Sequence, residues 1–195
     1  MPQPMDDRHT GYFGYGSLVN SRTRSGGAGR RSFVQGWIRQ WRHCSLLNGH
    51  KCCALTVAPR DGVILSGVFV ADSDDGLAKI DEREEGYSRE RVSVSLERAP
   101  RKPEIIPGFL YLSEPPYRRA GDDEYPIWRT YLDCVLAGYL RTFGVAGAED
   151  FVRTTEGWDC PIVDDRSAPL YPRADVLTET EAQIINRILT EHGIL

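Results

Sequence analysis

The order of the periodic patterns along the chain constrains its fold more than any other feature. Strand-like patterns dominate up to Leu112, with one short helix among them, and long helical patterns come only afterwards. A parallel sheet would need a crossover helix between successive strands, and no strict alternation of that kind is present. The sequence therefore predicts an α+β fold with a mixed, largely antiparallel sheet, curled into a small barrel with flanking helices.

Five segments carry strand-like patterns after an opening strand near Tyr12. They are 33–41, 54–57, 63–70, 92–96 and 105–112. The segment 63–70 is apolar at both odd and even positions, which is typical of a central strand covered on both faces. Pro59 and the Asp61–Gly62 turn are expected to end the strand before it. Pro107–Gly108 predicts a bulge or an edge position in the last strand.

A short helix is expected between the strands. Asp72 to Asp75 supply acidic N-cap candidates, and Gly86 is placed to close the helix. Leu77, Ile80 and Glu84 follow one another at i, i+3 and i+7. Because this spacing puts all three on one face, the Glu84 carboxylate should point toward the core rather than to water.

Helical patterns fill most of the second half of the chain. A helix over 126–143 should stop at Gly144, and a shorter one is expected over 149–154. The segment 156–173 has no period, which predicts a long loop packed on the surface. Thr178 to Glu181 is a capping-box signature and predicts the start of a final helix. Its buried side should carry Ile184, Ile185, Ile188 and Leu189.

The chain can bury one substantial core, because it has 195 residues of which 41% are hydrophobic. A single domain over 1–195 is therefore expected, with 156–195 as a C-terminal extension of loop plus helix. No internal repeat divides the sequence.

Charge and hydropathy exclude several classes of partner. The net charge is -4, and the Arg-rich segment 21–31 is too short to change the sign of the surface, so nucleic acid is not expected as a partner. No apolar run is long enough to span a bilayer, and the start of the chain, 1–10, is polar. Neither a signal peptide nor a membrane anchor is expected, and the predicted location is the cytoplasm.

The five cysteines do not form the pattern of a disulfide framework, since their number is odd and Cys52 and Cys53 are adjacent. The cluster His43, Cys44, His50, Cys52 and Cys53 raises the alternative of a zinc site. Its spacing is not that of two chelating pairs, and neighbouring residues of a strand point to opposite faces. Neither a metal nor any other cofactor is therefore expected, and the thiols should be small buried side chains.

The stretch Tyr12–Leu18, Tyr-Phe-Gly-Tyr-Gly-Ser-Leu, carries the strongest chemical signal. Large aromatic residues lead into two glycines, so a strand should end in a loop whose backbone can approach a ligand closely. Exposed N–H groups in such a loop can hold an oxygen anion. The alternative interpretation is an ordinary turn at the end of a strand.

Three common motifs do not fit this stretch. A dinucleotide-binding fingerprint would need a third glycine where Val19 stands. A serine-hydrolase elbow would need glycines at Tyr15 and Val19, on either side of Ser17. The sequence also has no Walker lysine in this loop. An amide hydrolase of unrelated fold is accordingly disfavoured by the missing nucleophile elbow.

Glu84 is the carboxylate that the helical spacing predicts to be buried. Burial disfavours ionisation, so the pKa of Glu84 should rise toward a value useful for proton transfer near neutral pH. The alternative is a structural ion pair with an arginine such as Arg89 or Arg91. The residues by themselves leave both interpretations open.

Tyr12–Leu18 and Ile80–Tyr87, Ile-Asp-Glu-Arg-Glu-Glu-Gly-Tyr, together resemble the γ-glutamylcyclotransferase family, including its ChaC and AIG2-like branches. In that family a Tyr-Gly-Ser loop near the N-terminus is followed by a Leu-Asp-x-x-Glu segment whose last Glu is catalytic. The ChaC branch closes that segment with Gly-Tyr. Order, spacing and the intervening strand 67–70 agree from about Gly11 to Val94.

The resemblance weakens further along the chain. The helix that contains Tyr131 resembles the family's Pro-Ser-x-x-Tyr-Leu helix start, but Ile127 or Trp128 stands where the serine is expected. The Asn-Pro element typical of ChaC is not evident after Tyr111. The segment 156–195 lies outside the resemblance.

The resemblance implies a cyclotransferase with a small-molecule γ-glutamyl substrate, and glutathione is one candidate. The α-amine of the substrate would attack its own γ-carbonyl, which releases 5-oxoproline and an amine or amino acid. Glu84 is implied as the general acid and base. Backbone N–H groups around Gly16, Ser17 and Leu18 would hold a substrate oxygen.

Three tyrosines are candidates to line the pocket, and ordinary core packing is the alternative for each. They are Tyr15, Tyr87 and Tyr131. A second hypothesis for the chain is a protein of the same fold that binds a small molecule without turnover. The leaving amine, the oligomeric state, the pathway and any ligand contact of the segment 21–31 stay open.

Overall fold

The structure is a computed structural model that describes residues 10–24, 26–97 and 102–195. Most of the polar start of the chain, and Ser25 in the Arg-rich segment, lie outside the described residues. Within the described ranges, no helix combines the length and the apolar character needed to cross a membrane.

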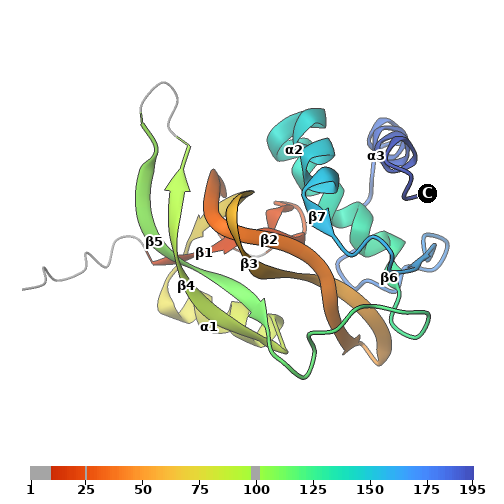
Figure 1. Ribbon diagram of the computed structural model, residues 1–195, viewed down its shortest axis with the longest axis horizontal. Coiled ribbons are helices and arrows are strands. Elements are labelled where there is room, and N and C mark those ends of the chain that lie inside the picture. Colours follow the sequence, from red (N-terminus) through yellow and green to blue (C-terminus); the bar gives the residue numbers. More distant parts are fainter. Residues whose placement is uncertain (1–9, 25, 98–101) are drawn as a thin grey trace, which may run out of the picture.

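Strands come first and the longer helices follow (Figure 1). The elements are β1 (Gly11–Gly14), a 3-10 turn η2 (Ser17–Val19), β2 (Arg30–Leu47), β3 (His50–Ala71), α1 (Asp74–Arg83), β4 (Tyr87–Leu96), β5 (Glu104–Ser113), β6 (Ile127–Trp128), α2 (Arg129–Arg153), β7 (Thr155–Glu156), β8 (Ile162–Val163) and α3 (Glu179–Glu191).

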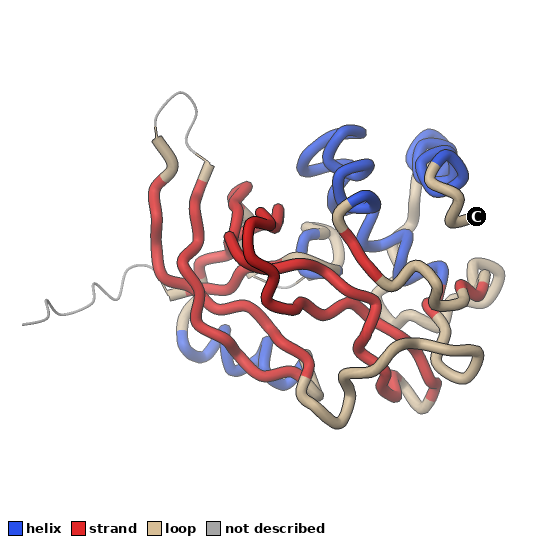
Figure 2. The backbone as a smooth tube through the Cα atoms, viewed as in Figure 1, coloured by secondary structure: helices blue, strands red, loops and turns tan. Residues whose placement is uncertain are grey.

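Strands β1 to β5 close into a mixed barrel, which Figure 2 shows in red. The order is β3-β1-β5-β4-β2, and β2 pairs again with β3 to complete the circle. Only the β1–β5 contact, at Tyr12 and Phe109, is parallel, and the other four barrel pairings are antiparallel. The predicted α+β fold with a largely antiparallel, curled sheet is confirmed.

The longest pairing, between β2 and β3, depends on a two-residue turn. Asn48 and Gly49 connect the strands with φ values of 50° and 79°. A tight hairpin turn of this type needs positive φ at both central residues, and Asn-Gly is the pair that adopts it most readily. The turn fixes the register, with Leu47 opposite His50.

The prediction that Pro59 and the Asp61–Gly62 turn separate two strands was wrong. One continuous strand, β3, covers both segments, and the turn is accommodated as a bulge. Gln35 pairs with Ile64 and Trp37 pairs with Pro59, so residues 60–63 loop out opposite Gly36. Gly36 and Gly62 have φ values of 82° and 79°, which let both strands bend at this point.

The bulge predicted at Pro107–Gly108 is not present, because β4 and β5 keep an unbroken register from Tyr87–Ser113 to Leu96–Glu104. The alternative, an edge position, fits the structure. Residues 104–107 extend past the end of β1, so they pair with β4 on one side and with no strand of the barrel on the other. This half of the β4–β5 hairpin projects from the barrel in Figure 1. Proline is tolerated at such an edge because its missing N–H is not needed there.

The helix predicted over 126–143 begins later than expected, at Arg129, because Ile127 and Trp128 form β6. Gly144 interrupts α2 with φ 76° and ψ -173°, and the helix continues beyond it to Arg153. A capping box at Thr178 and Glu181 begins α3, whose Ile185, Ile188 and Leu189 are buried. The segment 156–173 is mostly loop, but it contains the short strand β8, which pairs with β6. Both long helices lie on one side of the barrel in Figures 1 and 2.

Candidate active site

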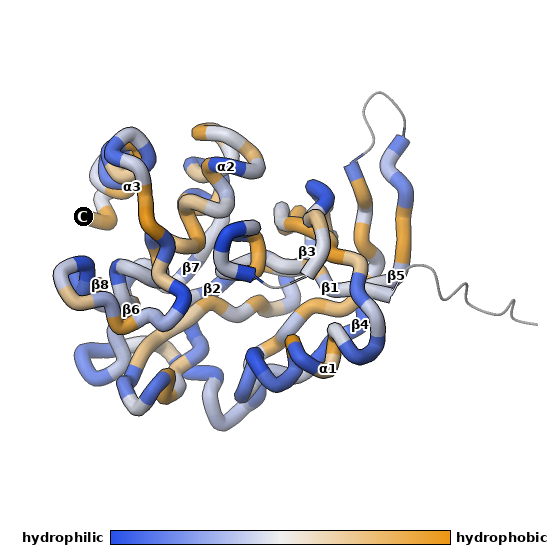
Figure 3. The backbone as a smooth tube through the Cα atoms, turned by 180° about the vertical axis from the view of Figure 1, so that it is seen from behind, coloured by the Kyte–Doolittle hydropathy of each residue, from blue (hydrophilic) through white to orange (hydrophobic). Residues whose placement is uncertain are grey.

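Helix α1 positions Glu84 at the interior of the molecule. Ser73 caps the helix by accepting a hydrogen bond from the Gly76 N–H at 3.1 Å, and Leu77 and Ile80 are buried. The remaining surface of α1 is mostly hydrophilic (Figure 3). The helix ends at Arg83, so Glu84 is the C-cap residue and not part of the helical face as predicted. Gly86, with φ 82°, then turns the chain into β4.

The Glu84 side chain still points inward, with 17% of its surface exposed. Its carboxylate lies 3.1 Å from Nε of Arg83, and Nη2 of Arg83 donates to Oγ of Ser17 at 3.3 Å. Arg83 thus bridges the carboxylate and the glycine loop. The predicted alternative of an ion pair with an arginine is thus present, with Arg83 as the partner, whereas Arg89 pairs with Asp81 at 3.0 Å.

Burial raises the pKa of Glu84 above the ordinary range of a glutamate. The positive charges of Arg83 and Arg173 act in the opposite direction and offset part of this rise. A carboxyl group held in this way exchanges protons closer to neutral pH than an exposed glutamate does.

The glycine loop presents backbone donors to the same region. In η2 the N–H groups of Val19 and Asn20 donate to the carbonyls of Gly16 and Ser17 at 3.0 and 3.1 Å. The N–H groups of Ser17 and Leu18, at the start of the turn, have no acceptor among the described residues. The first donors of a helical turn are left free in this way by its geometry.

The loop is anchored immediately after these donors. Asn20 is fully buried, and its Nδ2 donates to the carbonyl of Cys134 at 2.9 Å and to the carboxylate of Asp175 at 2.8 Å. Gly138 of α2 packs against the same residue, where a Cβ would lie 2.8 Å from the Asn20 nitrogen. Helix α2 and the C-terminal extension therefore both hold the loop in place.

A small cavity of about 20 Å³ lies between the loop and Glu84. The structure brings all seven residues that the sequence singled out to its wall, together with Leu55 and Tyr111. The seven are Tyr15, Gly16, Ser17, Leu18, Glu84, Tyr87 and Tyr131. A space of this size holds little more than one water-sized group, so it can receive an oxygen atom of a ligand but not the whole molecule.

The three tyrosines differ in how their hydroxyl groups are used. Tyr15 donates to the carbonyl of Tyr111, and Tyr87 donates to the carbonyl of Leu55 at 2.7 Å. The Tyr131 hydroxyl accepts from the N–H of Leu55 at 3.4 Å, so its own proton stays available. Burial raises the pKa of all three phenols well above 10, which keeps them protonated.

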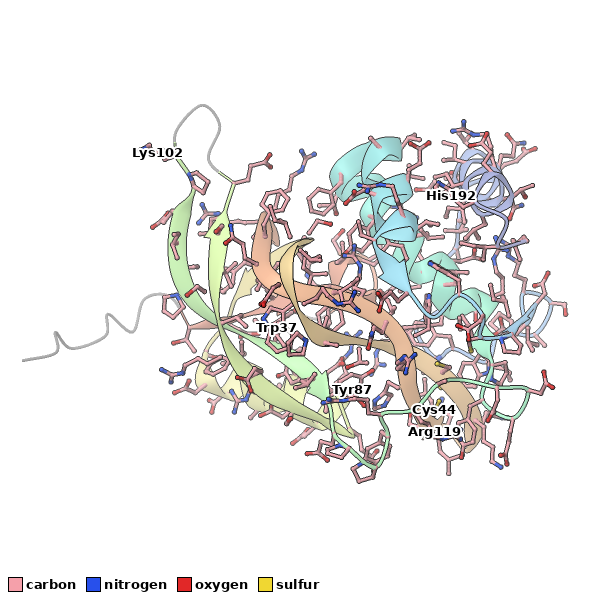
Figure 4. All side chains as sticks on the ribbon, viewed as in Figure 1. Trp37, Cys44, Tyr87, Lys102, Arg119 and His192 are labelled. Carbon is pink, nitrogen blue, oxygen red and sulfur yellow. The ribbon has the colours of Figure 1, made fainter. Side chains whose placement is uncertain are left out.

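A larger cavity of about 500 Å³ opens beside the small one and shares four wall residues with it, Ser17, Glu84, Tyr87 and Tyr131. His43 also lines it, stacked on Tyr87 with ring centres 3.9 Å apart. Tyr87 marks this end of the barrel in Figure 4. Burial lowers the pKa of His43 to about 4, so its imidazole is neutral at physiological pH. From the sequence, His43 was expected only as an alternative metal ligand, and its place in this wall was not predicted.

The C-terminal extension supplies three further residues of the wall, Tyr171, Pro172 and Arg173. The buried ring of Tyr171 meets the Tyr131 ring edge-on at 5.0 Å. These residues were also missed, because the segment that carries them has neither a periodic pattern nor a resemblance to guide its placement.

Asp165 ties the extension to the start of α2. This buried carboxylate accepts hydrogen bonds from the N–H of Thr130 at 2.8 Å, from the Thr130 hydroxyl, and from the N–H of Leu170 at 2.9 Å. It therefore caps the first turn of α2 and fixes the chain just before Tyr171.

Replacing Asp165 with alanine is expected to lower the free energy of unfolding by about 2 kcal/mol, because two buried donors of Thr130 and the half-buried N–H of Leu170 lose their acceptor. Urea unfolding measures the change. Asp164→Ala is the matched control, since the exposed Asp164 accepts, from the described part of the chain, only the hydrogen bond of the Arg166 N–H. Equal losses in the two variants would contradict the structural role given to Asp165.

The cysteines form no disulfide, and all five are buried thiols. Among the described residues, no group of three or more His, Cys, Asp and Glu side chains is arranged to hold a metal ion. Cys44 and Cys53, two members of the cluster considered for zinc, face each other across β2 and β3. Cys44 is labelled in Figure 4.

Known structures share the fold of this chain, whereas no family model and no curated protein sequence matches it. A structure described as a γ-glutamyl cyclotransferase aligns with 91% of this chain and 98% of its own, at a TM-score of 0.58 and 16% identity. The chain has the γ-glutamylcyclotransferase fold. An uncharacterized protein from Homo sapiens shares this fold at a TM-score of 0.60 and 19% identity, over 90% of this chain and 97% of its own.

YkqA from Bacillus subtilis has the fold as well, at a TM-score of 0.53 and 17% identity. The match covers 79% of this chain but 56% of YkqA. Structural matches at sequence identities this low show that the fold is shared. The chemistry depends on the residues of the site itself.

Proposed function

We propose that the protein is a γ-glutamylcyclotransferase, which converts a γ-glutamyl substrate into 5-oxoproline and a free amine or amino acid. The observation that carries this proposal is the position of Glu84. Its carboxyl group, with a raised pKa, shares a cavity with the free N–H groups of Ser17 and Leu18. One proton carrier and one oxygen-binding loop are the two parts that this reaction requires.

The reaction needs no nucleophile from the protein. The α-amine of the substrate attacks its own γ-carbonyl carbon, a new C–N bond closes the five-membered lactam, and the bond to the leaving nitrogen breaks. Glu84 accepts one proton from the α-ammonium group and returns it to the leaving nitrogen. Ring closure releases a second proton from the same α-nitrogen, and the free amine takes it up and departs as an ammonium group. Holding the substrate in the folded, ring-closing shape supplies much of the rate by proximity.

In this proposal each cavity holds a different part of the substrate. The larger one has room for the body of the ligand, and the small one receives a single oxygen, either the developing oxyanion or an α-carboxylate oxygen. Tyr131 adds a third donor on this side, because its hydroxyl proton is not used by Leu55. Tyr15 and Tyr87 donate to backbone carbonyls and serve as fixed walls.

A panel of γ-glutamyl compounds, including glutathione, tests the proposal. Each compound is incubated with the protein, and 5-oxoproline is measured by mass spectrometry. Release of 5-oxoproline from at least one compound is the expected result. Binding of a panel member without any release would instead support the alternative of a small-molecule binding protein with the same fold.

The value of kcat/KM is expected to fall at acid pH. The pKa of this fall should lie above the pKa of an ordinary glutamate, near 4.3. The reason is that Glu84 must be ionised to accept the proton, and burial raises its pKa. Stopped assays across the acid range measure this limb, after the ionisation of the substrate is determined separately by titration. An acid limb at the ordinary glutamate pKa would contradict the assignment of Glu84.

A further inference from the structure

The larger cavity has a chemical character of its own at the end formed by the C-terminal extension. Glu84 lies where the two cavities meet, and it returns a proton to the leaving nitrogen in the proposed reaction. The leaving group must therefore lie in the cavity of about 500 Å³, between Glu84 and the extension. This volume is in the range that binds small organic ligands.

Arg173 stands out among the arginines of this region because it forms neither a hydrogen bond nor an ion pair with any of the described residues. Arg83, Arg141 and Arg166 are each in an ion pair, with Glu84, Glu181 and Asp133 respectively. Arg173 is half-buried in the cavity wall, and the described part of the chain offers it neither a hydrogen-bond acceptor nor a carboxylate in contact. A guanidinium group presents five N–H donors in a fixed fork that matches a carboxylate.

The other charges of the wall do not cancel this guanidinium. Glu84 is already paired with Arg83, and Glu82 and Glu85 are exposed, so water screens them. The charge of Arg173 is felt inside the cavity, since it acts against the rise in the pKa of Glu84. His43 adds no charge because it is neutral. The inner part of the cavity thus carries one unmatched positive charge.

We propose that Arg173 binds a carboxylate on the leaving group, so that the substrates are γ-glutamyl amino acids or peptides rather than γ-glutamyl amines. This inference rests on the proposed cyclotransferase function and specifies its substrate class. Arg173 is a specificity-determining residue contributed by the extension, beyond the segments that carry the sequence resemblance.

The test compares γ-glutamylalanine with γ-glutamylalaninamide, which differ only in the charge of the leaving group. The parent protein is expected to show a kcat/KM about tenfold to a hundredfold higher for the acid, the range that a charge-assisted bidentate pair supplies. Arg173→Gln should reduce kcat/KM for the acid at least tenfold more than for the amide. Arg173→Lys should recover part of the preference, because it restores the charge without the fork.

Arg187→Gln is the matched control, since it removes the same charge from an exposed position on α3. It should keep the preference of the parent for the acid. Equal kcat/KM values for the two substrates in the parent would overturn the proposal. Equal losses for both substrates in Arg173→Gln would also overturn it, because Arg173 would then act only through Glu84.

Calorimetry separates failure of this inference from failure of the proposed function. Binding of γ-glutamylalanine and its amide is measured for the parent and for Arg173→Gln. Tighter binding of the acid that is lost in Arg173→Gln, without release of 5-oxoproline, would support the carboxylate site and contradict the cyclotransferase function. Release of 5-oxoproline with no dependence on the carboxylate would support the function and contradict the site.

Discussion

Replacing Glu84 with glutamine is expected to lower the rate of 5-oxoproline release by about 10²- to 10⁴-fold, the usual contribution of a general acid or base. Glutamine keeps the size of the side chain and an oxygen that can accept from Arg83, so the cavity should keep its shape. It cannot take a proton from the α-ammonium group. Turnover by Glu84→Gln at the parental rate would show that another group moves the proton.

The same substitution is expected to leave the melting temperature at pH 7 unchanged or to raise it. The pKa of Glu84 is higher in the folded chain than in the unfolded chain, so the folded state binds more protons between the two values. The free energy of unfolding therefore falls as the pH rises through that window, and at neutral pH the charge of Glu84 reduces stability. Loss of activity together with a lower melting temperature would indicate a damaged fold instead.

Glu90→Gln provides the matched control for both measurements. Glu90 is an exposed residue of β4 outside the two cavities, so its substitution removes one carboxylate without touching the site. Its rate and melting temperature should stay close to those of the parent.

Replacing Gly67 with valine is expected to lower the free energy of unfolding by about 3 kcal/mol. Gly67 lies in β3 where β1 crosses it closely, and a Cβ there would meet the carbonyl oxygen of Gly14 and, at 2.6 Å, the ring of Phe13. Both contacts belong to buried parts of β1, so neither can move away freely. The chain enters the loop of Ser17 and Leu18 directly after Gly14, so activity should fall as well.

Urea unfolding measures the loss, with Gly27→Val as the control. Gly27 is exposed, and a Cβ there would have only the carbonyl of Ala71 nearby, at 3.9 Å. Its substitution should change the free energy of unfolding by about 0.5 kcal/mol or less. A comparable loss in both variants would contradict the close approach of β1 to β3.

Local patterns indicated where the two parts of the candidate site lie, whereas their chemistry stayed open until the family resemblance was added. The aromatic run before Gly14 predicts a strand, and the spacing of Leu77, Ile80 and Glu84 predicts an inward carboxylate. Both predictions depend on neighbours within a few residues, where periodicity and glycine act directly. The prediction placed Glu84 inside the helix, whereas it is the residue after the last helical one. The spacing of apolar residues does not locate this final turn, which depends on Gly86.

The features that were missed depend on contacts between distant segments. Pro59 and Gly62 indicate a break when considered alone, but pairing with β2 absorbs them as a bulge opposite Gly36. Arg173 and Tyr171 reach the cavity because Asp165 holds their segment against Thr130, an interaction that no local pattern encodes. The Asn48–Gly49 hairpin is different, because its turn signal is present in the sequence and was not used.

The placement of Tyr171 and Arg173 also has a consequence for the order in which the site forms during synthesis. The five barrel strands and Glu84 emerge from the ribosome before the extension does, and they can pair while one wall of the larger cavity is still missing. The residue proposed to select the substrate is therefore synthesised later than the residue proposed to carry the proton. A ribosome-bound chain that has reached α2 contains Glu84 but not yet Arg173.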